Sequence, residues 1–208
     1  MTESKQEERK RLTRKKLLDA AGRVFVERGY HAPLIADIVA EAGVGQGTFY
    51  RYFDSKRQVM EVLLDEFVAG LLAEFDAMST DLPDSAASYR ESSQAAILRV
   101  ARALEQEQEL AAFFLRDGPS VDAAFAAKMD EILGRFAQLA QSFLDHAIAS
   151  GFARPCRSQV VAQALLGMAL RLLEGRGRGP LKDLNANELV AEGVALIFSG
   201  ISPEQAEG

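Results

Sequence analysis

Hydrophobic residues recur along the chain at spacings of three and four, which place them on one face of an α-helix. In the first such segment, residues 7–28, the side chains of Leu17, Ala21, Val24 and Phe25 share a face. No stretch alternates apolar and polar residues as a half-buried strand does, and no repeat is present. The pattern predicts an all-α chain of about nine helices. The other eight are expected near residues 34–43, 46–53, 56–78, 89–108, 109–116, 121–150, 157–174 and 186–199.

Several helix ends can be placed from single residues. Gly29 and Gly43 follow the first two helices, where a glycine in the left-handed conformation commonly ends a helix. Gly45 is expected to cap the third helix, and Asp54 or Ser55 the fourth.

Longer breaks separate the later helices. Residues 79–88 are polar and contain a proline, and DGPS (117–120) is expected to stop a helix, with Ser120 capping the next one. GFARPC (151–156) is another break. GRGRGPLKDLN (175–185) is predicted to be a loop between helices, and because no strand precedes it, a phosphate-binding loop is the weaker interpretation.

Two short helices joined by AGVG (42–45) form a helix-turn-helix arrangement. Gly43 can adopt the positive φ that the turn needs, and Val44 is its apolar plug. Phe49 and Phe53 are four residues apart and are expected to point into a small core.

The third helix and its flanks combine side chains that suit a DNA surface. Glutamine can bond adenine bidentately, threonine offers a hydroxyl and a methyl group, and glycine permits close backbone approach. Tyrosine hydroxyls and a lysine at a helix start suit phosphate oxygens. The alternative is that the tyrosines pack internally and Gln46 is solvated, but the spacing of the whole set favours DNA. The predicted DNA-binding residues are Gln46, Gly47, Thr48, Tyr50, Arg51, Tyr52 and Lys56.

Charge is distributed unevenly along the chain. Residues 1–57 hold twelve Lys/Arg and eight Asp/Glu, whereas the remaining residues hold twelve and twenty-two, and the net charge is −6. A basic head on an acidic body is expected where one small module meets a polyanion. Charge alone would also allow a solvated helix end.

The stretch GYHAPLIADIVAEAGVGQGTFYRYFDSKRQVMEVLL (29–64) resembles the DNA-binding head of the tetracycline-repressor (TetR) family of bacterial transcription regulators. The resemblance implies a DNA-binding domain at residues 1–56 and a ligand-binding and dimerisation domain at 57–208. It also implies a homodimer whose two heads are spread apart by a small-molecule effector bound in the C-terminal domain.

Two positions depart from the family pattern. Pro33 and Leu34 stand where the family usually has hydroxyl residues at the start of the second helix, and a missing hydroxyl cap costs about 1 kcal/mol. Gly45 replaces a usual serine. Binding is therefore expected to be weaker or to depend more on a basic arm, which comprises Lys5, Arg9, Lys10, Arg11 and Arg14.

The last two long helices carry apolar stripes suited to dimerisation. Val161, Leu165, Met168 and Leu172 form one stripe beside the small residues Ala164 and Gly167, and Val190, Val194 and Ile197 form another. Packing within one chain is an equal alternative for each of these residues.

Aromatic and apolar residues of the body could surround a lipophilic ligand, although a stripe at helical spacing is more often plain core. The predicted pocket residues are Phe67, Leu71, Phe75, Phe113, Phe114, Phe125, Met129, Phe136, Phe143 and Arg171.

Catalytic and metal-binding patterns are lacking. His31 and His146 have no partners at metal-ligand spacing, and Cys156 is interpreted as filler near a loop. No catalytic residue, metal or cofactor is expected, and the absence of a signal peptide or membrane span predicts a cytoplasmic protein. The sequence predicts a ligand-responsive transcriptional regulator, most simply a repressor that leaves a palindromic operator when a lipophilic effector binds. The alternative is a helical small-molecule-binding protein with a degenerate DNA-binding head.

Overall fold

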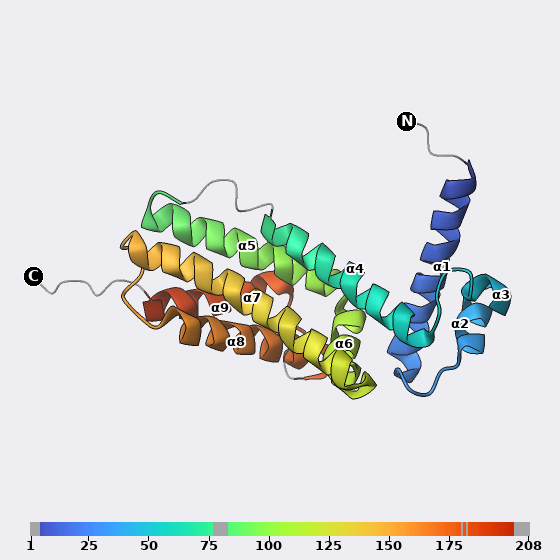
Figure 1. Cartoon of the computed structure of the whole chain (residues 1–208). Helices are drawn as coiled ribbons and strands as arrows, with labels where there is room; N and C mark the ends of the chain where they lie inside the picture. The colour runs from blue at the N-terminus through green and yellow to red at the C-terminus, as the bar shows by residue number, and fades with distance from the viewer. Residues whose placement is uncertain (1–4, 77–82, 180, 182, 202–208) are drawn as a thin grey trace, which may run out of the picture. The chain divides into compact units, whose positions relative to one another are not determined.

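The computed structural model describes residues 5–76, 83–179, 181 and 183–201. In these ranges the chain forms nine helices and no strand, which confirms the all-α prediction (Figure 1). None of the described helices combines the length and apolar character needed to cross a membrane. The helices are α1 (Lys5–Arg28), α2 (Ile35–Ala42), α3 (Gln46–Phe49), α4 (Lys56–Asp76), α5 (Ala86–Gln106), α6 (Gln108–Val121), α7 (Ala123–Ala149), α8 (Ser158–Arg178) and α9 (Ala186–Ile201).

Two compact units divide the chain. The first contains residues up to Ala69 together with Glu109–Ala126. In its core, Phe25 of α1 stacks on Phe113 of α6 with ring centroids 5.9 Å apart. The first unit therefore extends beyond the predicted DNA-binding domain, residues 1–56, because α6 supplies part of its core. The functional boundary between residues 56 and 57 stays a prediction.

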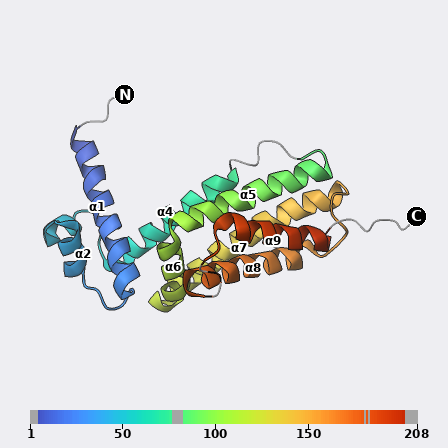
Figure 2. The same ribbon diagram turned by 180° about the vertical axis from the view of Figure 1, so that it is seen from behind.

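The second unit contains Gly70–Gln108 and the chain from Ala127 onward. Figures 1 and 2 show α5, α7, α8 and α9 running alongside one another in it. Tyr89 of α5, Leu144 of α7 and Phe198 of α9 belong to its buried core. Tyr89 and Phe198 lie with ring centroids 5.8 Å apart, and burial raises the pKa of the Tyr89 hydroxyl.

The predicted helix ends near the head are confirmed. Gly29 and Gly43 have φ values of 74° and 64°. Gly45 is the N-cap of α3 in an extended conformation. At the start of α4, the Ser55 hydroxyl accepts the Gln58 N–H at 3.1 Å.

Four boundary predictions were wrong, and two of them concern the DGPS segment. DGPS does not stop the helix, because α6 runs through Pro119 to Val121. Ser120 stays within α6 and donates to the Asp117 carbonyl at 2.7 Å. The cap of α7 is Asp122, whose carboxylate accepts the Phe125 N–H at 2.8 Å.

The other two errors concern α3 and α8. Helix α3 ends at Phe49 rather than at residue 53, because the chain tightens into a turn in which the Arg51 N–H donates to the Thr48 carbonyl. The backbone of α8 continues to Arg178, so the predicted loop at 175–185 begins later. Glycine is a poor helix former but it does not by itself end a helix.

The turn at Gly43 can be tested by substitution. A Cβ at this residue would meet no atom within 4 Å, so the only cost of Gly43→Ala is the left-handed backbone. We expect that cost to lower the free energy of unfolding by about 1–2 kcal/mol. Gly22→Ala is the matched control, because its Cβ would meet Leu63 at an ordinary 3.9 Å inside α1. That change should raise stability by about 0.5–1 kcal/mol. Urea denaturation measures the free energy of unfolding of both variants. An unchanged value for Gly43→Ala would contradict the expected cost of the left-handed backbone.

Candidate nucleic-acid interface

The helix-turn-helix is held together by its glycine turn and two phenylalanines. The Gly43 N–H donates to the Ala40 carbonyl at 3.1 Å, and the Val44 N–H donates to the Val39 carbonyl at 3.0 Å. These bonds end α2 and turn the chain into α3. Phe49 and Phe53 are buried with ring centroids 5.8 Å apart, as predicted. The two rings fix one face of α3 and leave the opposite face outward.

The outward face carries most of the predicted DNA-binding residues. Gln46, Gly47 and Arg51 are exposed, and Tyr50 is 57% exposed, which is unusual for a tyrosine. Thr48 and Tyr52 are half-buried. A Cβ at Gly47 would meet no atom within 4 Å. Internal packing therefore does not require a glycine there, and any such requirement must come from a partner that approaches the backbone.

Lys56 has contacts that its place in the sequence does not reveal. Its Nζ atom donates to the carbonyl oxygens of Tyr30, His31 and Pro33, at 2.6, 3.3 and 2.8 Å. It also lies 4.6 Å from the centroid of the Tyr30 ring. Burial lowers the pKa of the Lys56 ammonium group, whereas the carbonyl partners favour its charged form. All three ammonium hydrogens thus have an acceptor in the link between α1 and α2.

The start of α2 has no hydroxyl cap, and the Asp37 carboxylate supplies a different hydrogen bond there. Pro33 is buried, and Leu34, the N-cap residue, is 68% exposed. The Asp37 carboxylate folds back and accepts the Leu34 N–H at 2.7 Å, and it pairs with Arg28 at 3.2 Å. Since leucine offers no acceptor, only this half of a capping box is formed.

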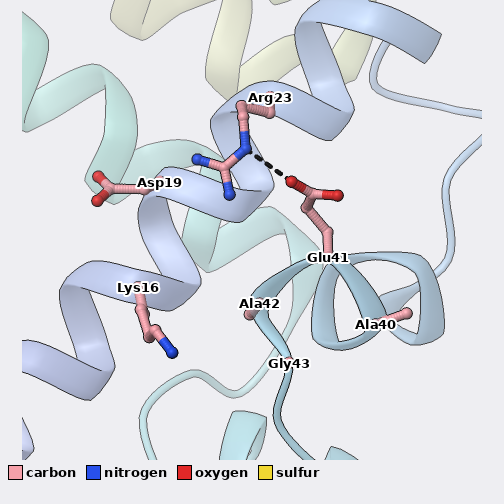
Figure 3. Close-up of a pocket in the computed structure, with 7 residues that line it drawn as sticks. All are labelled: Lys16, Asp19, Arg23, Ala40, Glu41, Ala42 and Gly43. Atoms are coloured by element: carbon pink, nitrogen blue, oxygen red, sulfur yellow. Dashed lines mark hydrogen bonds and ion pairs between the residues drawn. The ribbon is translucent and has the colours of Figure 1, made fainter.

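A shallow pocket lies between α1 and the end of α2 (Figure 3). The Arg23 guanidinium crosses it and donates to the Glu41 carboxylate at 2.7 Å. Lys16 and Asp19 of α1 line the same pocket. Its charges have both signs, and the Arg23–Glu41 pair joins α1 to α2.

Comparison with known proteins agrees with this geometry. Residues 17–63, which span the second half of α1, the helix-turn-helix and the start of α4, match the family model of bacterial regulatory proteins of the tetR family. The segment from residue 17 to residue 63 is therefore similar to that family.

One curated relative is the HTH-type transcriptional repressor KstR2 of Rhodococcus jostii, 35% identical over 75 residues. The match covers 36% of this chain and 37% of KstR2, so the chain spans little more than a third of that relative.

Solved structures share the fold over nearly the whole chain. SmeT of Stenotrophomonas maltophilia, solved with triclosan, is 20% identical with a TM-score of 0.79 and covers 93% of each chain. FadR of Bacillus subtilis, solved with stearoyl-CoA, is 21% identical with a TM-score of 0.76, covering 90% of this chain and 98% of FadR. These similarities place the C-terminal helices in a TetR-like fold.

The end of α6 and the start of α7 are bonded to the head within the first unit. The His31 Nε2 atom lies 3.0 Å from the Ser120 carbonyl oxygen. The Arg57 guanidinium forms two hydrogen bonds with Asp122 and lies 5.0 Å from the Phe125 ring centroid. This bonding raises the pKa of Arg57 and lowers that of the Asp122 carboxyl. Sequence reasoning missed both links, because the partners are 89 and 65 positions apart with no local pattern.

The predicted ligand-pocket residues are distributed over both units. Phe67, Phe113 and Phe114 come together in the first unit, with Phe114 having a ring centroid 5.5 Å from each of the other two. Of the others, Phe125, Leu71 and Met129 are buried, Phe136 and Phe143 are half-buried, and Arg171 is exposed. The Phe75 side chain lies outside the described residues. The pocket stays a prediction.

The predicted dimer residues also divide into two groups. Val190 and Val194 lie in the core of the second unit, so for them packing within the chain is the correct alternative. Ala164 and Gly167 are exposed on α8. Val160 of α8 is 62% exposed and Leu196 of α9 is 66% exposed, which sequence reasoning did not single out.

Replacing Lys56 by methionine separates its two candidate roles. Lys56→Met removes the donor from three carbonyl groups, so we expect the free energy of unfolding to fall by about 1–2 kcal/mol. Lys15→Met is the control, since it breaks only an exposed pair with Asp19, worth less than about 0.5 kcal/mol. Thermal and urea denaturation measure both variants. If Lys56 served only to bind phosphate, stability would be unchanged while the salt slope of DNA binding fell by about 0.9 per protomer.

Proposed function

We propose that this chain is a ligand-responsive, sequence-specific DNA-binding transcriptional regulator that acts in the cytoplasm as a repressor. The observation that carries the proposal is the outward face of α3. Gln46, Gly47 and Thr48 lie on this helix, whose other face is anchored by Phe49, and Tyr50 and Arg51 lie in the turn that follows it. Base readout in the major groove requires such donors and acceptors on a rigidly held helix.

The operator is a palindrome read by a homodimer in this proposal. One helix-turn-helix offers few base contacts, so specificity comes from two heads related by a two-fold axis. The exposed apolar residues Val160 and Leu196 support a surface for the second copy, together with the small exposed residues Ala164 and Gly167. Small residues permit helices of the two copies to approach closely.

A small lipophilic effector releases the protein from DNA. SmeT and FadR, which share the fold, were solved with triclosan and stearoyl-CoA, each of which has a large apolar part. The proposed effector site uses the predicted aromatic residues of the C-terminal domain, residues 57–208. The effector shifts the dimer toward a head spacing that cannot reach successive major grooves. The protein performs no catalysis in this scheme.

One observation favours a second function. Leu34 exposes an apolar side chain at the start of α2, where the family usually offers a hydroxyl to phosphate. A small-molecule-binding protein with a degenerate head would tolerate that change. The two functions differ in whether the protein binds duplex DNA with sequence preference.

Selection of random-sequence duplexes by the purified protein at about 0.15 M salt tests the regulator proposal. We expect an inverted repeat to be enriched. Thr48→Ala and Tyr50→Phe should each weaken binding to the selected duplex by about 5- to 150-fold, the effect of about 1–3 kcal/mol per lost contact. Gln94→Ala, an exposed change on α5, is the control and should bind as the parent does. If no sequence is enriched, the small-molecule-binding alternative replaces the regulator.

The dimer surface can be tested separately. Leu196→Glu places a charge on the proposed interface, where burial of an unpaired charge is strongly unfavourable. We expect light scattering to change from twice 22.7 kDa for the parent to 22.7 kDa for this variant. Ile97→Glu is matched in chemistry and lies on α5, with an exposed fraction of 37%. It should remain dimeric, and identical masses for the two variants would refute the proposed surface.

A further inference from the structure

The first three turns of α1, residues 5–16, lie before the segment matched by the family model. The basic arm, defined above by five of its cations, is taken here as this whole segment. It contains seven cations and two carboxylates, Glu7 and Glu8. No residue of the arm is buried, and the first buried residue of α1 is Leu17. At about 1.5 Å per residue the arm extends roughly 18 Å beyond that point, and Figures 1 and 2 show the start of α1 projecting past α2 and α3.

The arm continues the same helical stripe that packs the head. Leu17, Ala21 and Val24 are buried at spacings of four and three. Continued toward the N-terminus at the same spacings, this stripe reaches Arg14 and then Lys10. The face of α1 directed at the rest of the head therefore changes from apolar to basic where the core ends. Packing within the head does not explain why cations occupy this stripe, because the stripe is no longer buried there.

Arg14 places the base of the arm beside the end of the helix-turn-helix. Its guanidinium lies 5.6 Å from the ring centroid of Phe53, which follows α3, and donates to Glu66 at 2.9 Å. Lys10 is one turn further out on the same side. The arm is thus anchored next to the surface that carries Thr48 and Tyr50.

The outer cations of the arm have little internal compensation. Within the described ranges, Lys5, Arg9 and Lys10 form no ion pair, whereas Lys15 pairs with Asp19. Seven cations in twelve residues repel one another along a helix. A neighbouring polyanion would remove this repulsion, and the proposed partner of α3 is one.

We propose that the basic arm is a second DNA-contacting element, in which Lys5, Arg9 and Lys10 bind backbone phosphates flanking the bases read by α3. This inference rests on the proposed function. The arm supplies affinity without sequence preference, because phosphates are identical at every step while only base edges differ. It compensates for the phosphate contact that Pro33 and Leu34 do not offer.

Salt dependence of binding tests the arm. A Lys5→Gln/Arg9→Gln/Lys10→Gln variant should lower the slope of log K against log salt concentration by up to about 2.7 per protomer, since each phosphate contact contributes about 0.9. The ratio of affinities for the selected and a scrambled duplex should stay unchanged. Fluorescence anisotropy between about 0.05 and 0.2 M salt measures both. Circular dichroism verifies that the fold, whose core starts at Leu17, is retained.

A charge-matched variant provides the control. Arg99→Gln/Arg135→Gln/Arg157→Gln removes three exposed cations from the second unit, and it should leave the slope unchanged. Equal slopes for the arm variant, the control and the parent would overturn the proposal. The proposal would also be overturned if the whole protein bound anionic vesicles more strongly than duplex DNA and the arm variant lost that binding. The partner of the arm would then be a membrane surface.

Failure of the arm and failure of the proposed function give different results. The arm is tested by the salt slope on any duplex, including a random one. Sequence-specific regulation is tested by the discrimination that Thr48→Ala removes. If the protein bound duplexes through the arm without sequence preference, the arm variant would still lower the salt slope. Thr48→Ala would then have no discrimination between duplexes to remove.

Discussion

Burial of Phe49 is the interaction on which the rest of the head depends. Helix α3 has only four residues, and so short a helix is not stable in isolation, because nucleation costs more than its few hydrogen bonds return. Its position is therefore set by tertiary packing. Phe49 has no exposed surface and contacts Phe53, which is also buried. With one face fixed in this way, Gln46, Thr48 and Tyr50 project outward together.

The elements around α3 limit how that face can move. Gly43 sets the angle between α2 and α3, and Lys56 joins the start of α4 to three carbonyls of the α1–α2 link. The Arg57–Asp122 and His31–Ser120 bonds connect the head to the end of α6 and to the residue that follows it. The first unit thus combines the proposed DNA-binding surface with part of the chain that follows the predicted domain boundary. A ligand-dependent change in residues 109–126 would act on the head through these bonds.

The two helices of the proposed interface differ in the charge of the groups that they offer to DNA. The face of α3 offers mostly neutral donors and acceptors, which suit base edges. The N-terminal turns of α1 offer cations, which suit phosphates at any sequence. Two physically different kinds of contact, carried by neighbouring helices, separate specificity from affinity. The departure at Pro33 and Leu34 affects the second kind, which can be supplied from elsewhere on the surface.

The sequence by itself determined the helical class, the position of the helix-turn-helix and the outward set on α3. Periodicity, Gly43 and the Phe49–Phe53 spacing are local signals, and each acts within a few residues. Only the tertiary structure decided the partners of Lys56 and Arg57, the use of Val190 and Val194 as core, and the cap at Asp122 rather than Ser120. The physical reason is that hydrogen bonds and burial depend on what lies nearby in space. The carbonyls bound by Lys56 are more than twenty positions away in the chain, and a stripe at helical spacing has the same appearance whether its own chain or a second copy covers it.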